Sequence, residues 1–231
     1  GCAKKNLSHM LHDLEAGCRA KSVHCAGAPV YLRATAGLRL LQPKERESIL
    51  QGAAEAIRQS AFRLASLPRT LPGSEEALYD WLMVNAAART LGAPRGGTYA
   101  VLDLGGGSTQ IAFEPASTPP SSEGMHQLGA PLGGRALYAV SRLGLGMNEA
   151  HAGVLARWRG AARHPCTLPG DYEGCRKELS AFVRAAEEEG STGLGRQPRT
   201  PPLPPAVRLV GLDNFYFAVL ALWGGDASRA P

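Results

Sequence analysis

The sequence predicts an α/β fold, because segments with the pattern of strands alternate with segments that have the period of helices. The clearest strands are residues 98–104 and 108–113, two largely apolar segments on either side of three consecutive glycines. In the clearest helix, apolar residues recur at helical spacing after Pro43: Ile49, Ala53, Ala56 and Ile57. No internal repeat is visible along the chain.

The first third of the chain contains one predicted strand and one predicted helix. Residues 1–28 show no clear period. Residues 29–33 (PVYLR) predict a short buried strand, and the small residues 34–37 predict a turn. The helix that follows is expected to extend from Pro43, near its first position, to about Ala65.

A second helix is expected after the break at Pro72 and Gly73. Ser74 is a candidate for its N-cap, and acidic residues in its first turn are favoured by the helix dipole. The inner face of this helix is expected to carry four residues: Leu78, Trp81, Leu82 and Asn85.

After the glycine-containing hairpin, residues 136–143 predict another strand. Helices are expected from about residue 148 to 159 and from about 174 to 188. The apolar segment 207–222 closes the predicted fold.

The composition excludes some classes of partner. The net charge of +5 comes from 25 basic and 20 acidic residues without any dense basic block, so we expect no nucleic-acid partner. No apolar segment is long enough to span a bilayer, so any membrane anchor of the full-length protein would lie outside this segment. Because the sequence begins without Met or a signal peptide, we expect it to be an internal piece of a longer protein.

Five cysteines favour an oxidising compartment and do not form a zinc pattern. Cys166 and Cys175 lie close together in a segment rich in Pro and Gly, which predicts a short disulfide loop. Cys18 and Cys25 are candidates for a second disulfide, which would leave Cys2 unpaired.

The glycine turn is the main functional candidate. A tight turn at Gly105, Gly106 and Gly107 leaves backbone N–H groups without Cβ atoms around them, and such a concavity binds anions, typically phosphate. Asp103 would repel that phosphate unless a divalent cation, Mg²⁺ or Ca²⁺, lay between them and bound through water. Ser108 and Gln110 point the same way along the strand. The alternative is a hairpin whose glycines serve turn geometry alone.

Two other segments contain residues suited to phosphate chemistry. The segment YLRATAGLRLL, residues 31–41, places Thr35 and Arg39 around a small-residue turn. The segment GSEEALYDW, residues 73–81, places two carboxylates at a helix start, where one can act as a general base.

In this order, the segments ATAGLRLL, GSEEALYDWLMVN and LDLGGGSTQIAFEP resemble the nucleoside triphosphate diphosphohydrolases, which include apyrases and Golgi nucleoside diphosphatases. The resemblance extends to LYAVSRLGLGMNEA, HPCTLPGDYEGC and LDNFYFAV and so covers most of the chain. It implies an actin/sugar-kinase/heat-shock ATPase-like (ribonuclease H-like) fold, with two α/β lobes whose mixed sheets are flanked by helices. Residues 1–113 would form part of the N-terminal lobe, and residues 114–231 part of a truncated second lobe.

The resemblance also implies a reaction, the direct attack of water on the terminal phosphorus of a nucleoside di- or triphosphate. It assigns the general base to Glu76 and the positioning of water to Ser108 and Gln110. The backbone of Gly105, Gly106 and Gly107 would bind the terminal phosphate. The remaining expected roles are cation binding through water by Asp103 with Thr35 nearby, support of the site by Arg39, and stacking on the base by Tyr216 or Phe215.

Two features differ from the family pattern. No segment before Tyr31 corresponds to the family's first phosphate loop, and Ala77 stands where the family usually has Gly. Two alternatives therefore stay open: an enzyme similar to exopolyphosphatases and guanosine pentaphosphatases, and an inactive nucleotide-binding fragment. For the favoured interpretation we expect a protein of the secretory pathway, in the Golgi lumen or at the cell surface. The chain as given is expected to have little activity alone.

Overall fold

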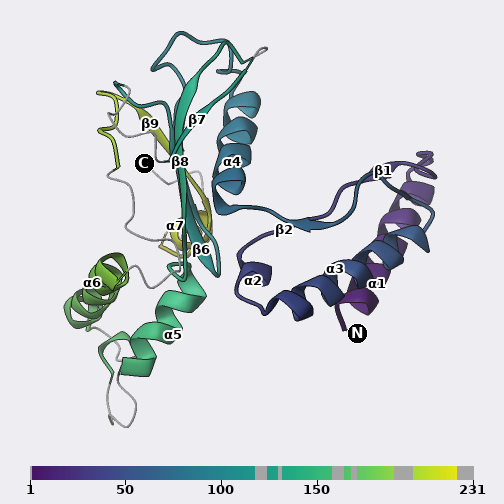
Figure 1. Cartoon of the computed structure of the whole chain (residues 1–231), viewed down its shortest axis with the longest axis horizontal. Helices are drawn as coiled ribbons and strands as arrows, with labels where there is room; N and C mark the ends of the chain where they lie inside the picture. The colour runs from purple at the N-terminus through teal and green to yellow at the C-terminus, as the bar shows by residue number, and fades with distance from the viewer. Residues whose placement is uncertain are drawn as a thin grey trace. The chain divides into compact units, whose positions relative to one another are not determined.

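A computed structural model of the chain describes residues 2–117, 124–129, 132–157, 164–167, 171–189 and 200–222 (Figure 1). It divides into two compact units, unit 1 with residues 1–71 and unit 2 with residues 72–231. The boundary expected between residues 113 and 114 falls inside unit 2, where β6 (Ser108–Phe113) pairs with β8 (Ala136–Leu143). The assignment of those two ranges to two lobes stays a prediction.

Unit 1 is built from two longer helices, a one-turn helix and four very short strands. These are α1 (Cys2–Ala20), β1 (Pro29–Val30), β2 (Arg33–Ala34), α2 (Ala36–Arg39), α3 (Pro43–Arg58), β3 (Arg63–Leu64) and β4 (Arg69–Thr70). The strands form two parallel pairs, β1 with β3 and β2 with β4. The expected strand at residues 29–33 is therefore two short strands, and the expected turn at residues 34–37 contains the start of α2.

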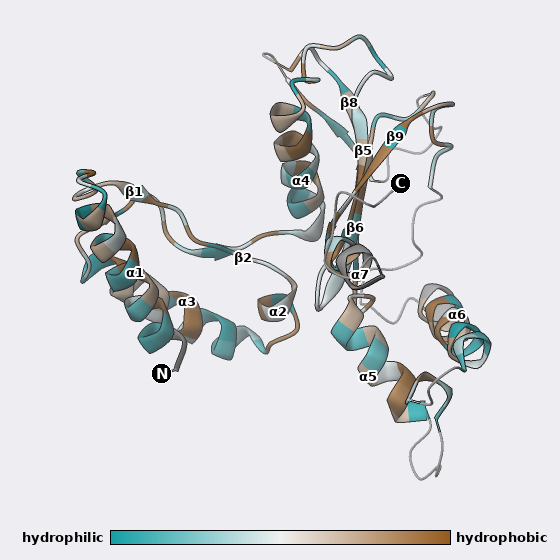
Figure 2. Ribbon diagram, turned by 180° about the vertical axis from the view of Figure 1, so that it is seen from behind, coloured by the Kyte–Doolittle hydropathy of each residue, from teal (hydrophilic) through white to brown (hydrophobic). Residues whose placement is uncertain are grey.

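The helix α1 was not predicted. It packs on α3 through a small cluster in which Leu11 and Ile57 are buried. The large apolar residues of α1 stand at helical spacing, at positions 7, 10, 11 and 14, but Met10 and Leu14 are 66% and 53% exposed, so only part of this face is buried in unit 1. Figure 2 shows hydrophilic and hydrophobic residues side by side on α1 and α3.

The helix α3 ends at Arg58, seven residues earlier than expected. After its last turn, the Ser60 hydroxyl donates a hydrogen bond to the Ile57 carbonyl at 2.7 Å and accepts one from the Phe62 N–H at 3.2 Å. A serine side chain that bonds its own backbone competes with helical hydrogen bonds. The apolar residues after Arg58 therefore belong to a turn and to β3.

Unit 2 is organised around one mixed sheet, as the predicted fold class requires. Its strands follow the order β7 (Met125–Gln127), β8, β6, β5 (Tyr99–Leu104) and β9 (Arg208–Asp213). All neighbouring strands are antiparallel except β5 and β9, which are parallel. The helices of this unit are α4 (Gly73–Ala87), α5 (Met147–Arg157), α6 (Tyr172–Glu189) and α7 (Asn214–Leu222), with a short 3₁₀ helix at Pro165–Thr167. The hairpin of β5 and β6 around the three glycines is confirmed.

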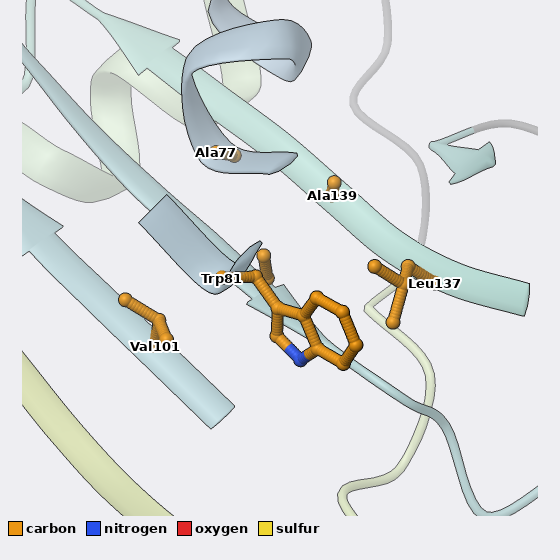
Figure 3. Packing of buried hydrophobic residues seen from close by; sticks show 6 residues of the cluster. Ala77, Trp81, Val101, Leu137 and Ala139 are labelled. Atoms are coloured by element: carbon orange, nitrogen blue, oxygen red, sulfur yellow. The ribbon is translucent and has the colours of Figure 1, made fainter. Parts of the chain in front are cut away.

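The helix α4 covers one face of this sheet. Ala77 and Trp81, both fully buried, contact a cluster on that face that contains Val101, Leu137 and Ala139 (Figure 3). Because side chains alternate along a strand, their neighbours Ala100, Phe113, Tyr138 and Val140 form a second cluster on the opposite face. The inner face predicted for α4 is therefore correct.

Asn85 fixes α4 to the first residue of β5. Its amide nitrogen donates to the carbonyls of Trp81 and Tyr99, at 2.9 and 3.1 Å. Its amide oxygen accepts from the Tyr99 N–H at 2.8 Å and from the Thr90 hydroxyl at 2.6 Å. Asn85 is fully buried, so these bonds set where α4 lies along the sheet.

The start of α4 differs from the prediction. The helix begins at Gly73 after Pro72, so Ser74 already lies inside its first turn and no side chain caps it. Glu75 and Glu76 are in the first turn, as expected. The Ala77 methyl group points into the buried cluster (Figure 3) and therefore fills the core of this unit.

The later elements agree with the sequence within a few residues. The expected helix at 148–159 begins at Met147 and is described as far as Arg157, and residues 158 and 159 lie outside the described ranges. The closing apolar segment is a strand, β9, followed by α7. Disulfides join Cys18 to Cys25 and Cys166 to Cys175, as the sequence predicts.

Candidate functional site

The turn between β5 and β6 is closed by its own backbone and held by the start of α5. The Gly105 N–H donates to the Ser108 carbonyl at 3.0 Å. All three glycine carbonyls accept hydrogen bonds from the segment 144–149: Gly144 N–H to Gly107 O at 2.8 Å, Met147 N–H to Gly105 O at 2.9 Å and Asn148 N–H to Gly106 O at 2.9 Å. The first N–H groups of α5, which have no partner inside the helix, thus bind the glycine turn.

The carbonyl groups of the turn therefore accept hydrogen bonds, whereas two of its backbone N–H groups stay available to a ligand. In the described part of the chain, the N–H groups of Gly106 and Gly107 take part in no hydrogen bond. A Cβ atom at Gly106 would lie 2.9 Å from the Asn148 amide nitrogen, so a side chain there would require Asn148 to move. Adjacent free N–H groups without side chains around them are suited to binding an anion.

The segment that holds the turn contains a second glycine with a spatial role. A Cβ atom at Gly146 would clash with the Ser108 nitrogen and would lie 2.5 Å from the carbonyl carbon and oxygen of Gly106. From the sequence, Gly144 and Gly146 are both expected to serve turn geometry. Gly144 has the positive φ, +84°, that this role requires, whereas Gly146 is needed because the backbone of the glycine turn approaches it closely.

Ser108 and Gln110 lie on the face of the sheet that α4 covers, and each is only 2% exposed. The Gln110 amide nitrogen donates to the Ser108 hydroxyl at 2.6 Å and to the Ser141 hydroxyl at 3.2 Å. The Gln110 amide oxygen is buried and has no hydrogen-bond partner in the described residues. These contacts fix the orientation of both side chains beside the turn.

Carboxylates from α4 and β5 face the same region. Burial, together with the charges of Asp103 and Glu76, raises the pKa of Asp80 to about 7. Burial, together with the charges of Asp213 and Glu76, raises the pKa of Asp103 to about 6. Glu76, the expected base, therefore lies within electrostatic range of Asp103, two residues before the glycine turn.

These pKa shifts have a consequence for stability. The folded chain holds the protons of Asp80 and Asp103 more tightly than an unfolded chain does, because the usual pKa of aspartate is 3.8. Below pH 3.8 both groups contribute fully to stability. This contribution is lost as the pH rises through the folded-state pKa, about 6 for Asp103 and about 7 for Asp80. At neutral pH, the metal-free site thus contains carboxylates that destabilise it, a common property of functional sites.

The end of β9 borders the glycine turn from the other side. The Asn214 amide nitrogen donates to the Leu104 carbonyl at 2.6 Å. Asp213 has a positive φ of 56°, and its carboxylate oxygen would lie 3.8 Å from a Cβ atom at Gly105.

The two aromatic candidates in α7 differ in exposure. Tyr216 is 52% exposed. Phe215 packs against Gly211, since a Cβ atom at Gly211 would lie 2.8 Å from the Phe215 side chain. Of the two aromatic candidates, Tyr216 has the more accessible ring.

Thr35 and Arg39 belong to unit 1. Thr35 is exposed and precedes α2, and its carbonyl accepts hydrogen bonds from the N–H groups of Leu38 and Arg39 at 3.1 and 3.3 Å. The Arg39 guanidinium donates to the Leu71 carbonyl at 3.3 Å. The roles expected for Thr35 and Arg39 at the phosphate stay predictions.

Within the described ranges, no three His, Cys, Asp or Glu side chains are grouped closely enough to bind a metal ion together. Two carboxylate oxygens, Oδ2 of Asp80 and Oδ1 of Asp103, are nevertheless buried without a hydrogen-bond partner in this part of the chain. Hard divalent cations bind such oxygens, directly or through water. The donor set therefore fits Mg²⁺ or Ca²⁺ held partly through water.

Three parts of this region were not predicted: Asp80, Asp213 and the α5 start that holds the turn. One signal was available for Asp80, which follows Glu76 by four residues and so lies on the same side of the helix. The other two depend on contacts between segments far apart in the sequence.

The chain resembles known proteins over most of its length. Residues 10–190 match the GDA1/CD39 (nucleoside phosphatase) family. The chain is 36% identical over 176 residues to Apyrase 1 of Arabidopsis thaliana, covering 71% of this chain and 37% of that protein. It is 34% identical over 181 residues to Ectonucleoside triphosphate diphosphohydrolase 6 of Homo sapiens, and this match covers 72% of this chain and 37% of that protein. It thus spans well under half the length of these relatives.

A solved structure supports the fold. The crystal structure of nucleoside triphosphate hydrolases from Neospora caninum matches 91% of this chain and 49% of that one, with a TM-score of 0.58 and 18% sequence identity. The expected actin-like fold class is confirmed. The sequence match over residues 10–190, together with relatives above 30% identity, also confirms the resemblance inferred from the motifs. The chain belongs to the GDA1/CD39 (nucleoside phosphatase) family.

Proposed function

We propose that the full-length protein hydrolyses nucleoside di- or triphosphates, releasing inorganic phosphate by direct attack of water on the terminal phosphorus. One observation carries the proposal: Gly106 and Gly107 present two N–H groups without partners among the described residues, next to a group of carboxylates. Family membership supports it, since relatives are named apyrase and ectonucleoside triphosphate diphosphohydrolase.

In this proposal the glycine turn binds the terminal phosphate. The N–H groups of Gly106 and Gly107 would donate to its oxygens, while Gly105 keeps the turn closed through its bond to Ser108. Because the α5 start holds the glycine carbonyls, the donors are oriented before the nucleotide binds. Such preorganised donors stabilise the negative charge of a phosphoryl transition state without further rearrangement.

Glu76 is the proposed general base, which accepts a proton from the attacking water. Ser108 and Gln110 would position that water, since their mutual hydrogen bond fixes both side chains beside the turn. No covalent intermediate is required, because phosphoryl transfer depends mainly on positioning and on the stabilisation of charge. Tyr216 would stack on the base of the nucleotide, and Arg39 would support the phosphates.

The proposal includes a divalent cation, Mg²⁺ or Ca²⁺. Asp103, with Thr35 nearby, would hold it through water, which agrees with the buried Asp103 oxygen that has no partner in the described region. When bound, such a cation neutralises charge on the phosphate oxygens. It would also relieve the repulsion among the carboxylates around Asp103.

We also propose a location in the secretory pathway, in the Golgi lumen or at the cell surface. Two disulfides join cysteines of the chain, and disulfides persist in oxidising compartments. A relative from Schizosaccharomyces pombe, 35% identical over 167 residues, is named Golgi apyrase. None of the described helices has the length and apolar character of a membrane span.

Phosphate release by the full-length protein should require a divalent cation. We expect phosphate to be released from nucleoside di- or triphosphates when Mg²⁺ or Ca²⁺ is present. In excess chelator, the rate of release should fall by about 100-fold or more, which is the order of a catalytic metal's contribution. Colorimetric measurement of inorganic phosphate tests this, and adding the cation back should restore the rate.

Two results would count against the proposal. Undiminished turnover in excess chelator would exclude the role of the cation. Absence of release from every nucleotide, with or without cation, by a folded protein would favour the alternative of an inactive nucleotide-binding member of the family.

A further inference from the structure

We propose that Asp80 is an additional binding group for the divalent cation, holding it through a water molecule beside Asp103. This inference rests on the proposed function, because the cation is the one that accompanies the nucleotide. It assigns Asp80 a part in cation affinity and leaves the role of general base with Glu76.

The position of Asp80 on α4 is set by the core. Ala77 and Trp81 are fully buried against the sheet and fix the rotation of the helix. Glu76 and Asp80 each precede one of these residues and are four positions apart, so they lie next to each other on one side of α4. The charges of both Glu76 and Asp103 act on Asp80, which places its carboxylate in the same group.

Asp80 is half-buried, and no partner among the described residues accounts for the burial of one of its carboxylate oxygens. Its Oδ2 atom is buried, and no hydrogen bond or ion pair to Asp80 occurs within the described ranges. The charges that act on Asp80 and Asp103 come from other carboxylates: Glu76 on the same helix as Asp80, Asp103 on β5, and Asp213 at the end of β9. A buried carboxylate among like charges is unfavourable unless a cation compensates it.

A second side chain points independently to a ligand. Gln110, on β6, is directly opposite Asp103 in the antiparallel pair, so the two lie on the same face of the sheet. Gln110 is 2% exposed, and its amide oxygen is buried without a partner in the described part of the structure. Since its amide nitrogen is fixed by Ser108 and Ser141, this oxygen is held in place rather than free to rotate.

Three elements therefore supply oxygens that lack partners: Asp80 on α4, Asp103 on β5 and Gln110 on β6. Carboxylate and amide oxygens are the ligands that Mg²⁺ and Ca²⁺ prefer, and Mg²⁺ in particular retains several waters in nucleotide sites. Because the described acidic side chains are not close enough to bind a metal together, a contact through water fits the Asp80 geometry best. Groups that hold a metal's ligands in this way typically change its affinity 10–100-fold when they are removed.

The test is cation affinity in the full-length protein, with Asp80→Asn as the variant and Glu75→Gln as the matched control. Glu75 is on the same helix and loses the same charge, but it does not act on Asp80 or Asp103. Ca²⁺ and Mg²⁺ are each titrated calorimetrically into protein saturated with a non-hydrolysable analogue of the nucleotide that it hydrolyses fastest. We expect the Kd for the cation to rise about 10–100-fold in Asp80→Asn and to change less than about twofold in Glu75→Gln. Asp80→Glu, which keeps the charge, should retain more affinity than Asp80→Asn.

A second readout separates cation binding from a structural role. In chelator, Asp80→Asn should unfold at the same temperature as the parent protein or at a higher one, because repulsion among buried carboxylates is reduced. A lower unfolding temperature in chelator, or an unchanged Kd for the cation, would overturn the assignment of Asp80. If the parent protein itself binds no cation with the nucleotide analogue, the proposed function fails together with this inference. If the parent binds it and Asp80→Asn binds it equally well, the inference on Asp80 alone fails.

Discussion

Replacement of Glu76 by glutamine is expected to lower kcat of the full-length protein by about 10²–10⁴-fold, the usual contribution of a general base. The glutamine side chain has nearly the same shape but cannot accept the proton of the attacking water. Nucleotide affinity should change little, because the phosphate is bound by the backbone of the glycine turn. Initial rates of phosphate release give kcat, and calorimetric titration with a non-hydrolysable nucleotide analogue gives the affinity.

Glu75→Gln is the matched control for this experiment, since it removes the same charge from the neighbouring position of α4. Its kcat should stay within a few fold of that of the parent. A Glu76→Gln protein with nearly normal kcat would show that the base lies elsewhere. Loss of nucleotide binding together with kcat would mean that Glu76 acts on binding, contrary to the role proposed here.

Replacement of Gly146 by alanine is expected to damage both the fold and the site. The added methyl group would meet the backbone of Ser108 and Gly106, which cannot rotate away as a side chain can. We expect the free energy of unfolding to fall by about 1–3 kcal/mol, as overpacking typically causes. Because the same backbone carries the phosphate donors, kcat/KM should fall by about 100-fold, the effect of a displacement of about 1 Å in a catalytic site.

Gly92→Ala provides the control for Gly146→Ala. Gly92 also lies in a turn of unit 2, but a Cβ atom there would have no atom within 4 Å, and its φ does not require glycine. Chemical denaturation and phosphate release should both be close to those of the parent protein. Normal activity of Gly146→Ala would contradict the view that the α5 start holds the glycine turn in its active geometry.

Local patterns were sufficient to predict the elements that build the site. The glycine run marked the turn between β5 and β6, and the spacing of Trp81 and its neighbours marked the buried face of α4. The segment from Thr35 to Gln110 also contained the motifs of the family. These features depend on residues close together in the sequence, so a single sequence records them.

Most of the features that were missed depend on tertiary contacts. Gly146 has the sequence pattern of a turn glycine, because nothing in its neighbourhood shows that Gly106 and Ser108, almost 40 residues away in the sequence, approach it. Ser74 is a favourable N-cap residue, but here the cause is local: α4 begins two residues earlier than that cap requires, directly after Pro72. Asp80 was not predicted, because Asp103, which acts on it, lies on a different element. For Gly146 and Asp80 the decisive neighbour is distant in the sequence.

The central claim is that the N–H groups of Gly106 and Gly107 bind the terminal phosphate while Glu76 activates water against it. A crystal structure of the full-length protein with a divalent cation and a non-hydrolysable nucleotide analogue tests it most directly. We predict that oxygens of the terminal phosphate lie within hydrogen-bond distance of both N–H groups, about 2.7–3.2 Å, with a water molecule between the phosphorus and the Glu76 carboxylate. A terminal phosphate bound away from the glycine turn, or a Glu76 carboxylate directed away from that water, would contradict the claim.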